Sequence, residues 1–456
     1  MKKILVRAGM NPWEIYSPDE ALSRNLIGNN SGNLIYAYGV FRTLGVEGVR
    51  LEADHYQAGP ALADRINQEY SAFVIPLADA FRNDFVPNLV SLTKLVKQLK
   101  IPCIVTGVGL RTSYEPNIKE KKPYDHAVKN FMKAVLKRSA MVGVRGEITG
   151  DYLKRLGFRE EMDYRTIGCP SMYALGPEHS VKKPRIKEDS KISVNYSVMS
   201  PSPVIQMLNQ ILKENKNSQL VTQRMNELEL LYLGIPYQHQ QNKPDYPTSI
   251  CDPVYQEQRV RFFINAIQWI EAMRDMDLSI GGRMHGNIAA WLSGTPAVFL
   301  PHDGRMRELC EFHRLPSVPS HEVRKDETVE ELIEKADWQS AKLCQELNYR
   351  RYLDFLTMNG LKVREQKEKG NIEKETIFGP ETKKSEVCQK GQGVPAITAC
   401  KNLEEVALRW KHYERINLEY KNRTIREIRK RLAFYEPASV KKDAGRLALR
   451  LFGKMK

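Results

Sequence analysis

The chain has 456 residues, of which 42% are hydrophobic and 27% charged, a composition that predicts a globular protein of two or three domains. It shows no apolar run long enough to span a bilayer, and its first residues, MKKILVRAG, predict a strand and not a signal peptide. Its seven cysteines form no C-x-x-C pair, which argues against a disulfide framework or a zinc site and favours a reducing cytoplasm.

The net charge of +15 is concentrated toward the carboxyl end. Residues 361–456 hold 24 of the 70 basic and 13 of the 55 acidic residues, so that the first 360 residues are nearly neutral. A nearly neutral body argues against nucleic acid as a partner.

Residues 1–185 alternate short apolar runs with amphipathic runs. The predicted strands are KKILVRAG, SAFVIPLA, IPCIVTGVGL and MVGVR, and the predicted helices are NLIYAYGVFRTLGV, NLVSLTKLVKQLK, AVKNFMKAVLKRSA and EITGDYLKRLGF. This alternation predicts a first domain, 1–185, with a parallel sheet and helices on both faces.

The polar segment 178–190 predicts a linker, and the alternation resumes after it. The predicted strands are KISVNYSV, SQLVTQ, MDLSIGG and TPAVFLP, and the predicted helices are SPVIQMLNQILKEN, RVRFFINAIQWIEAMRD and GNIAAWLSG. We therefore expect a second parallel α/β domain over residues 190–330.

The rest of the chain is expected to be mainly helical. Residues 331–364 predict a helical segment, residues 365–398 a mobile linker because they are polar with few apolar side chains, and residues 399–456 a basic helical tail. In residues 440–456 leucine and phenylalanine stand among arginine and lysine, a pattern that favours peripheral contact with an anionic membrane. A helix that packs on a partner or on a second copy, or a tail docked on its own body, explains the same pattern.

The stretch GGRMHGN, residues 281–287, joins a predicted buried strand to a predicted helix. Ligands collect at the carboxyl ends of parallel strands, and a helix N-terminus favours anions. Arg283 offers a planar guanidinium for carboxylate or phosphate, and His285 can carry a proton. Gly286 and Asn287 are expected to contact the same ligand. The alternative is that Arg283 and His285 only cap neighbouring elements.

Other loops at predicted strand ends supply further ligand contacts for the same cleft. These expected contacts are Asn30, Gly32 and Asn33 in IGNNSGNLI, Gly107 and Gly109 in TGVGLR, Arg224 in TQR, and His302, which precedes Asp303. Each has a structural alternative, such as a helix cap or a tight turn. Arg145 in VRGEIT is expected to pair with a carboxylate rather than to reach the ligand.

Motifs of several other chemistries do not occur. The sequence has no G-x-S-x-G, no G-x-x-x-x-G-K-[ST], no H-E-x-x-H, and no G-x-G-x-x-G after its first strand. It also shows no aspartate-rich cluster. We therefore expect no metal and no dinucleotide or other cofactor.

Five segments occur in an order that resembles the polysaccharide pyruvyl transferase family: IGNNSGNLI, IPCIVTGVGLR, MVGVRGEITGDYLKRLGF, TIGCPSMYALGP and SIGGRMHGNIAAWLSGTPAVFLPHDGRMRELCEFHRLP. The resemblance covers residues 1–320, and R-x-H-G-x-x-x-A followed by G-x-P-A-V is its most specific part. It implies an α/β fold of GT-B type, in which two Rossmann-like domains face a cleft. The saccharide acceptor would bind on the first domain and phosphoenolpyruvate on the second.

The resemblance also implies an activity. Members transfer pyruvyl from phosphoenolpyruvate to a sugar, usually as a cyclic ketal, here for a cell-surface polysaccharide or its lipid-linked precursor. Arg283 and His285 match the family residues that bind or activate phosphoenolpyruvate. We expect Arg283 to clamp the anion and His285, with a pKa near neutral, to act as general acid or phosphate partner. Such an enzyme would work in the cytoplasm, with its basic tail at the inner face of the membrane.

Two loops depart from the family pattern. The family's N-x-G-D is Asn30-Ser31-Gly32-Asn33 here, and PLADAFRND, residues 76–84, replaces a glycine-rich segment. Both loops are expected to face the acceptor, so two alternatives stay open. One is a GT-B type glycosyltransferase that uses a nucleotide sugar, and the other is an inactive member that acts as a scaffold through its basic tail. We make no prediction of the oligomeric state.

Overall fold

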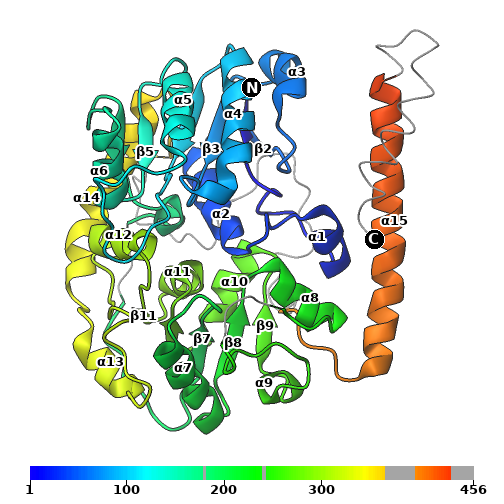
Figure 1. Ribbon diagram of the computed structural model, residues 1–456, viewed down its shortest axis with the longest axis vertical. Helices are drawn as coiled ribbons and strands as arrows, with labels where there is room; N and C mark the ends of the chain where they lie inside the picture. The colour runs from blue at the N-terminus through cyan, green and yellow to red at the C-terminus, as the bar shows by residue number, and fades with distance from the viewer. Residues whose placement is uncertain (178–180, 239–242, 365–395, 433–456) are drawn as a thin grey trace.

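The computed structural model describes residues 1–177, 181–238, 243–364 and 396–432. They form two parallel α/β halves and a long helix near the carboxyl end (Figure 1). The first half, blue to cyan, holds a sheet of order β2-β1-β3-β4. Its strands are β1 (Lys2–Val6), β2 (Val49–Ala53), β3 (Ala72–Pro76) and β4 (Cys103–Thr106), and β5 (Val142–Val144) and β6 (Tyr164–Thr166) form a further parallel pair. A parallel bridge between Val108 and Val144 joins this pair to the end of β4.

Helices cover both faces of the first sheet, as parallel strands buried on both sides require. These helices are α2 (Gly32–Leu44), α3 (Ala63–Glu69), α4 (Val86–Gln98), α5 (Asp125–Val135) and α6 (Glu147–Arg155), with short 3-10 turns at Pro60–Leu62, Asn83–Phe85 and Pro170–Tyr173. Helix α1 (Pro18–Arg24) lies beside the second half. Every residue of β3 and β4 is buried.

The second half, mainly green in Figure 1, holds a parallel sheet of order β11-β10-β7-β8-β9. Its strands are β7 (Ile192–Asn195), β8 (Gln219–Thr222), β9 (Val260–Phe262), β10 (Leu278–Gly281) and β11 (Ala297–Phe299). Its helices are α7 (Ser202–Glu214), α8 (Met225–Leu233), α9 (Pro253–Gln256), α10 (Ala266–Met273), α11 (Met284–Ser293) and α12 (Gly304–His313). The two parallel sheets and the helical carboxyl-terminal region confirm the predicted fold class.

One predicted helix is wrong. The run RVRFFINAIQWIEAMRD was expected to be a single helix, but its first part is strand β9 and only its second part is helix α10. Val260 and Phe262 are buried strand formers that pair with β8. Asn265 then begins the helix, because its side chain accepts hydrogen bonds from the backbone of Ile267 and Gln268. Strands β2 and β6 were not predicted at all.

Helix α14 (Ser340–Met358), which follows α13 (Val329–Lys335), crosses from the second half back to the first. Phe355 is fully buried and lies against Gly143 of strand β5. Arg351 donates to the backbone carbonyl of Thr166 in β6 at 2.7 Å. Helix α14 therefore packs on the outer strands of the first sheet and ties the two halves together.

Helix α15 (Leu403–Leu432) stands beside α1 and α8 (Figure 1). Just before it, Ile397 exchanges backbone hydrogen bonds of 3.1 and 2.9 Å with Phe262 of β9, so the last residues of the expected linker are docked. The other predictions for that linker, which fall on residues 365–395, and the expected membrane contact of residues 440–456 lie outside the described residues. No helix of the described part combines the length and the apolar character that crossing a membrane requires.

We predict that Phe355→Ala lowers the free energy of unfolding by about 3–5 kcal/mol, because it leaves a cavity between α14 and the first sheet. Leu347→Ala on the same helix is the control, since Leu347 is 69% exposed and surface changes usually stay within about 0.5 kcal/mol. Denaturant unfolding measures both. Equal losses in the two variants would show that α14 does not stabilise the first half.

Candidate functional site

The loop between β10 and α11 is held by a buried network around Asn287. The Asn287 amide donates to the carbonyls of Gly281 at 2.9 Å and Val298 at 3.2 Å, and its oxygen accepts from Asn195 at 2.7 Å and Ser279 at 2.8 Å. Asn287 is fully buried. The amide of Asn287 thus bonds only to other groups of the protein, and these bonds fix the shape of the loop.

Arg283 points into the second half. Its Nη2 forms a buried ion pair with Glu227, and its Nε donates to the Tyr196 carbonyl at 3.0 Å. Glu227 is 1% exposed and also accepts from the Tyr246 hydroxyl. Within the described residues no acceptor bonds the remaining Nη1 of Arg283. A clamp on an anion therefore stays a prediction for Arg283, through this one nitrogen.

His285 meets the first half of the molecule. A Cβ built on Gly32, at the start of α2, would lie 2.7 Å from His285 Nδ1, so a larger residue there would displace the ring. The other ring nitrogen, Nε2, lies 3.9 Å from the Cys169 sulfur. The loop before α2 and the loop before α11 thus bring Gly32 and His285 next to each other.

Burial, and then the positive charges of Arg145 and Arg305, lower the pKa of His285 to about 3, and the Asp79 carboxylate opposes them only in part. The expected near-neutral pKa is therefore wrong for the chain without ligand. The cause is physical: this imidazole sits in a positive field, and a second positive charge is disfavoured there. An anion bound beside His285 would raise the pKa of its imidazole.

Arg145, which was expected to pair with a carboxylate and not to reach the ligand, lies directly after β5, and its charge acts on His285. Arg145 is 2% exposed, and its Nε donates to the Gly107 carbonyl at 3.0 Å. Its guanidinium lies 5.2 Å from the centre of the Tyr36 ring, and among the described residues no carboxylate forms an ion pair with it. The predicted carboxylate partner is thus wrong. The available signal was its position directly after a buried strand.

The Asp79 carboxylate forms ion pairs with three guanidiniums, those of Arg82, Arg111 and Arg305. The distances are 2.5 Å to Arg82, 2.6 Å to Arg111 and 3.0 Å to Arg305. Burial raises the pKa of this carboxyl, but Arg305, Arg111 and Arg82 together outweigh burial and hold its pKa well below the usual range. Because Arg305 belongs to α12 and Asp79 follows β3, the ion pair between them joins the two halves.

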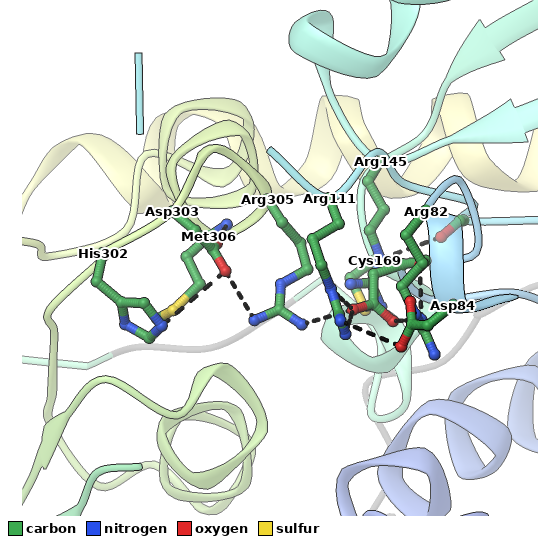
Figure 2. A network of polar contacts seen from close by, with 11 residues as sticks. Arg82, Asp84, Arg111, Arg145, Cys169, His302, Asp303, Arg305 and Met306 are labelled. Atoms are coloured by element: carbon green, nitrogen blue, oxygen red, sulfur yellow. Dashed lines mark hydrogen bonds and ion pairs between the residues drawn. The ribbon is translucent and has the colours of Figure 1, made fainter. Parts of the chain in front are cut away.

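Figure 2 shows Arg82, Arg111, Arg145 and Arg305 gathered between His302 and Asp84. Arg305 also pairs with Asp303 at 3.0 Å. Asp79, Asp84 and Asp303 thus stand opposite four guanidiniums, which leaves an excess of positive charge at this place. Asp79 and Arg82 belong to the segment 76–84 that was expected to face the acceptor, but none of Asp79, Arg82, Arg111 or Arg305 was predicted individually as a site residue.

Three buried polar atoms near these groups have no hydrogen-bond partner within the described chain: Ser31 Oγ, Gln223 Nε2 and His302 Nδ1. Ser31 precedes α2, and Gln223 Nε2 lies 2.9 Å from the Cβ position of Gly286, at the start of α11. Buried polar groups are rarely left unpaired, so such atoms mark a place for a ligand or water. Gly286 leaves room for that contact.

The remaining predicted contacts shape loops. Asn30 accepts from the Gly32 backbone at 2.8 Å, and Asn33 donates to the carbonyls of Ile27 and Gly28 at 3.1 Å. Both side chains thus hold the turn before α2, whose N-cap is Ser31 without a side-chain cap. Arg224 bridges Asn30 through its backbone, which brings the start of α8 to the same edge.

Gly107 and Gly109 make room for other site residues. A Cβ on Gly107 would lie 2.3 Å from the Tyr36 hydroxyl, and one on Gly109 would lie 3.1 Å from Arg145 Cδ. Burial lowers the pKa of His302 below its usual range, and the Asp303 carboxylate opposes this shift. Across the described ranges, no three His, Cys, Asp or Glu side chains gather as ligands of one metal ion would.

Comparison with known proteins gives one family. The polysaccharide pyruvyl transferase family matches residues 30–304. No curated protein matches the chain. Similar solved structures include the Methanocaldococcus jannaschii UDP-GlcNAc 2-epimerase in complex with UDP-GlcNAc and UDP, at 12% identity over 78% of this chain and 99% of that chain with a TM-score of 0.40. Another is Anabaena Alr3699/HepE in complex with UDP, at 15% identity over 79% and 98% with a TM-score of 0.34. Such low scores carry no argument about function.

We predict that Arg305→Gln raises the pKa of His285 above its value of about 3, because it removes one of the two charges that oppose protonation. Nuclear magnetic resonance of the histidine ring, followed against pH, measures this pKa. Arg307→Gln is the matched control, since Arg307 lies on the same helix and pairs with Glu311 instead. A His285 pKa that is equal in both variants would contradict the positive field.

Proposed function

The chain belongs to the polysaccharide pyruvyl transferase family, and from that premise we propose that it transfers the pyruvyl group of phosphoenolpyruvate to a saccharide acceptor. One observation carries the proposal: the buried His285 of the second half lies against Gly32 and Cys169 of the first half, and the charges of Arg145 and Arg305 act on it. We further propose that the acceptor belongs to a cell-surface polysaccharide or its lipid-linked precursor and that the reaction is cytoplasmic.

The site offers what phosphoenolpyruvate needs. This donor carries a carboxylate and a phosphate, and both favour guanidinium groups and helix N-termini. Arg145 and Arg305 are the charges that act most on His285, and α2 and α11 both begin beside its ring. The unpaired Ser31 Oγ and Gln223 Nε2 could donate further hydrogen bonds to the same anion. In this proposal Arg283 adds its Nη1 and positions the loop through Glu227.

The reaction balances with the groups at hand. A proton is added to the methylene carbon of phosphoenolpyruvate, and a sugar hydroxyl oxygen bonds to the central carbon. The bond from that carbon to the phosphate oxygen then breaks, and phosphate leaves. A second hydroxyl closes the ketal ring. Of the two hydroxyl protons, one replaces the proton given to the methyl group and the other leaves with phosphate.

His285 is the proposed proton carrier, with a role that depends on the donor. Without donor it is neutral near pH 7, because its pKa is about 3. The negative charges of the bound donor favour the charged imidazolium and raise this pKa. His285 thus becomes an acid only when the donor is in place, which suits an enolpyruvate that must be protonated at carbon.

The direct test is release of phosphate from phosphoenolpyruvate in the presence of saccharide acceptors. We expect His285→Gln and Arg145→Gln to slow it by about 100-fold or more, the usual size of an acid–base contribution. His321→Gln is the control, since this histidine is 58% exposed. Unchanged release in His285→Gln would sink the assignment. Thermal stabilisation by a nucleoside diphosphate, with none by phosphoenolpyruvate, would support the glycosyltransferase alternative.

We also predict that binding of phosphoenolpyruvate at pH 7 takes up protons. The pKa of His285 rises on binding, so the affinity increases as pH falls from the pKa of the complex toward about 3. Isothermal titration calorimetry in two buffers of different ionisation enthalpy measures the uptake. His285→Gln should remove the uptake that wild type shows. Equal uptake in both proteins would place the proton elsewhere.

A further inference from the structure

Arg7 follows β1 and lies between two aromatic rings. Its guanidinium carbon is 4.9 Å from the centre of the Tyr56 ring and 5.9 Å from that of Phe85. Neither ring was singled out by the sequence, and Arg7 has no place in the donor site described above. All three residues are half-buried, so the group can be reached from solvent.

The rings occupy the faces of the guanidinium and leave its edge for hydrogen bonds. Arginine donates five N–H bonds in the plane of the group, whereas aromatic rings contact its faces. Within the described residues no carboxylate forms an ion pair with Arg7, and no side chain accepts a hydrogen bond from it. The nearby Asp54 carboxylate, on which the charge of Arg7 acts, accepts from the backbone of Ala8 at 3.0 Å and of Tyr56 at 2.9 Å.

The backbone here is built at a cost. His55 and Tyr56 are consecutive residues with φ of 52° and 55°, a conformation that side chains other than glycine rarely adopt. The Nδ1 atom of His55 lies at hydrogen-bond distance, 2.8 Å, from the carbonyl oxygen of Gly9. A Cβ on Gly9 or Gly28 would come within 2.8 or 2.7 Å of the Tyr56 ring. The turn therefore fixes this ring, and with it the plane of Arg7.

A continuous row of contacts leads from Arg7 to the donor site. Phe85 also lies against Arg82, whose guanidinium carbon is 5.0 Å from the ring centre. Arg82 pairs with Asp79 at 2.5 Å, and Asp79 pairs with Arg305 at 3.0 Å. A ligand group on Arg7 would thus lie at the carboxyl ends of β1 to β3, on the same edge of the sheet as the proposed reaction.

We propose that Arg7, held by Tyr56 and Phe85, binds an anionic group of the saccharide acceptor. The inference rests on the proposed function and narrows its acceptor to a saccharide that carries a phosphate or a carboxylate. The guanidinium edge binds either group through paired hydrogen bonds. The rings keep the cation in one orientation, so that the acceptor's hydroxyls are presented toward His285.

The experiment compares four probes on the full chain by calorimetry: galactose 1-phosphate, galacturonate, galactose and phosphoenolpyruvate. We expect one of the two anionic sugars to bind more tightly than galactose, and the stronger of the two tells phosphate from carboxylate. Arg7→Gln should weaken that binding by about tenfold or more, as loss of a paired charge does. Arg7→Lys should recover only part of it, because a lysine provides no paired donors.

The controls separate this inference from the proposed function. Arg50→Gln makes the same charge change on an arginine whose side chain is 51% exposed, at the far end of β2, and should leave every affinity unchanged. Phe85→Leu keeps all charges and should weaken the anionic sugar but not phosphoenolpyruvate. Equal binding of galactose, or no effect of Arg7→Gln, overturns the inference. So does a parallel loss of phosphoenolpyruvate in Arg7→Gln, which would place Arg7 in the donor site. If phosphoenolpyruvate does not bind the wild-type protein, the proposed function is wrong. The sugar measurements still test whether Arg7 binds an anionic group.

Discussion

The ion pair between Asp79 and Arg305 is the contact on which the rest of the site depends. It joins a loop of the first sheet to helix α12 of the second half at 3.0 Å, and Asp79 holds two more arginines in place. Without such a carboxylate, three guanidiniums at a half-buried edge would repel one another and the halves would be pushed apart. With it, the arginines are fixed and the local charge stays positive. Burial, and then the charges of Arg145 and Arg305, explain the low pKa of His285 in the free chain.

The division of work between two arginines follows from the same constraint. Arg283 belongs to the most specific motif of the sequence. Its Nη2 pairs with the buried Glu227, and its Nε donates to the Tyr196 carbonyl. Arg145, which looked structural, has no such partner among the described residues and lies where it lowers the pKa of His285. A buried ion pair fixes a loop, whereas an arginine without a carboxylate is available to a ligand. The sequence motif therefore identifies the loop, and the charge balance identifies the arginine that is available to a ligand.

The regular alternation of strands and helices could be predicted because buried parallel strands are short apolar runs that end in turn residues. It failed at β9, where three strand residues and a helix share one apolar run and only the Asn265 cap separates them. For the site, the position of Gly32 beside His285 could be expected in part, since both lie at the start of a helix that follows a glycine-rich loop. The helix α1 that precedes the loop of Gly32 was not predicted. Asp79 lies in the segment 76–84 that was expected to face the acceptor, but its pairing with Arg305 could not be expected, because Arg305 lies in α12 of the second half. Arg7 could not be expected either, because only the folded chain brings the rings of Tyr56 and Phe85 against it.

The segment PLADAFRND bears on the alternative of an inactive scaffold. Its departure from the family pattern suggested a loss of activity. In the structure this segment supplies Asp79 and Arg82, and Phe85 directly follows it, so it contributes to both the proposed donor site and the proposed acceptor site. A site that had lost its ligand would have no need to keep four guanidiniums close together, since their repulsion costs stability. The charge arrangement therefore favours a site that still binds anions, with an acceptor chosen by this loop.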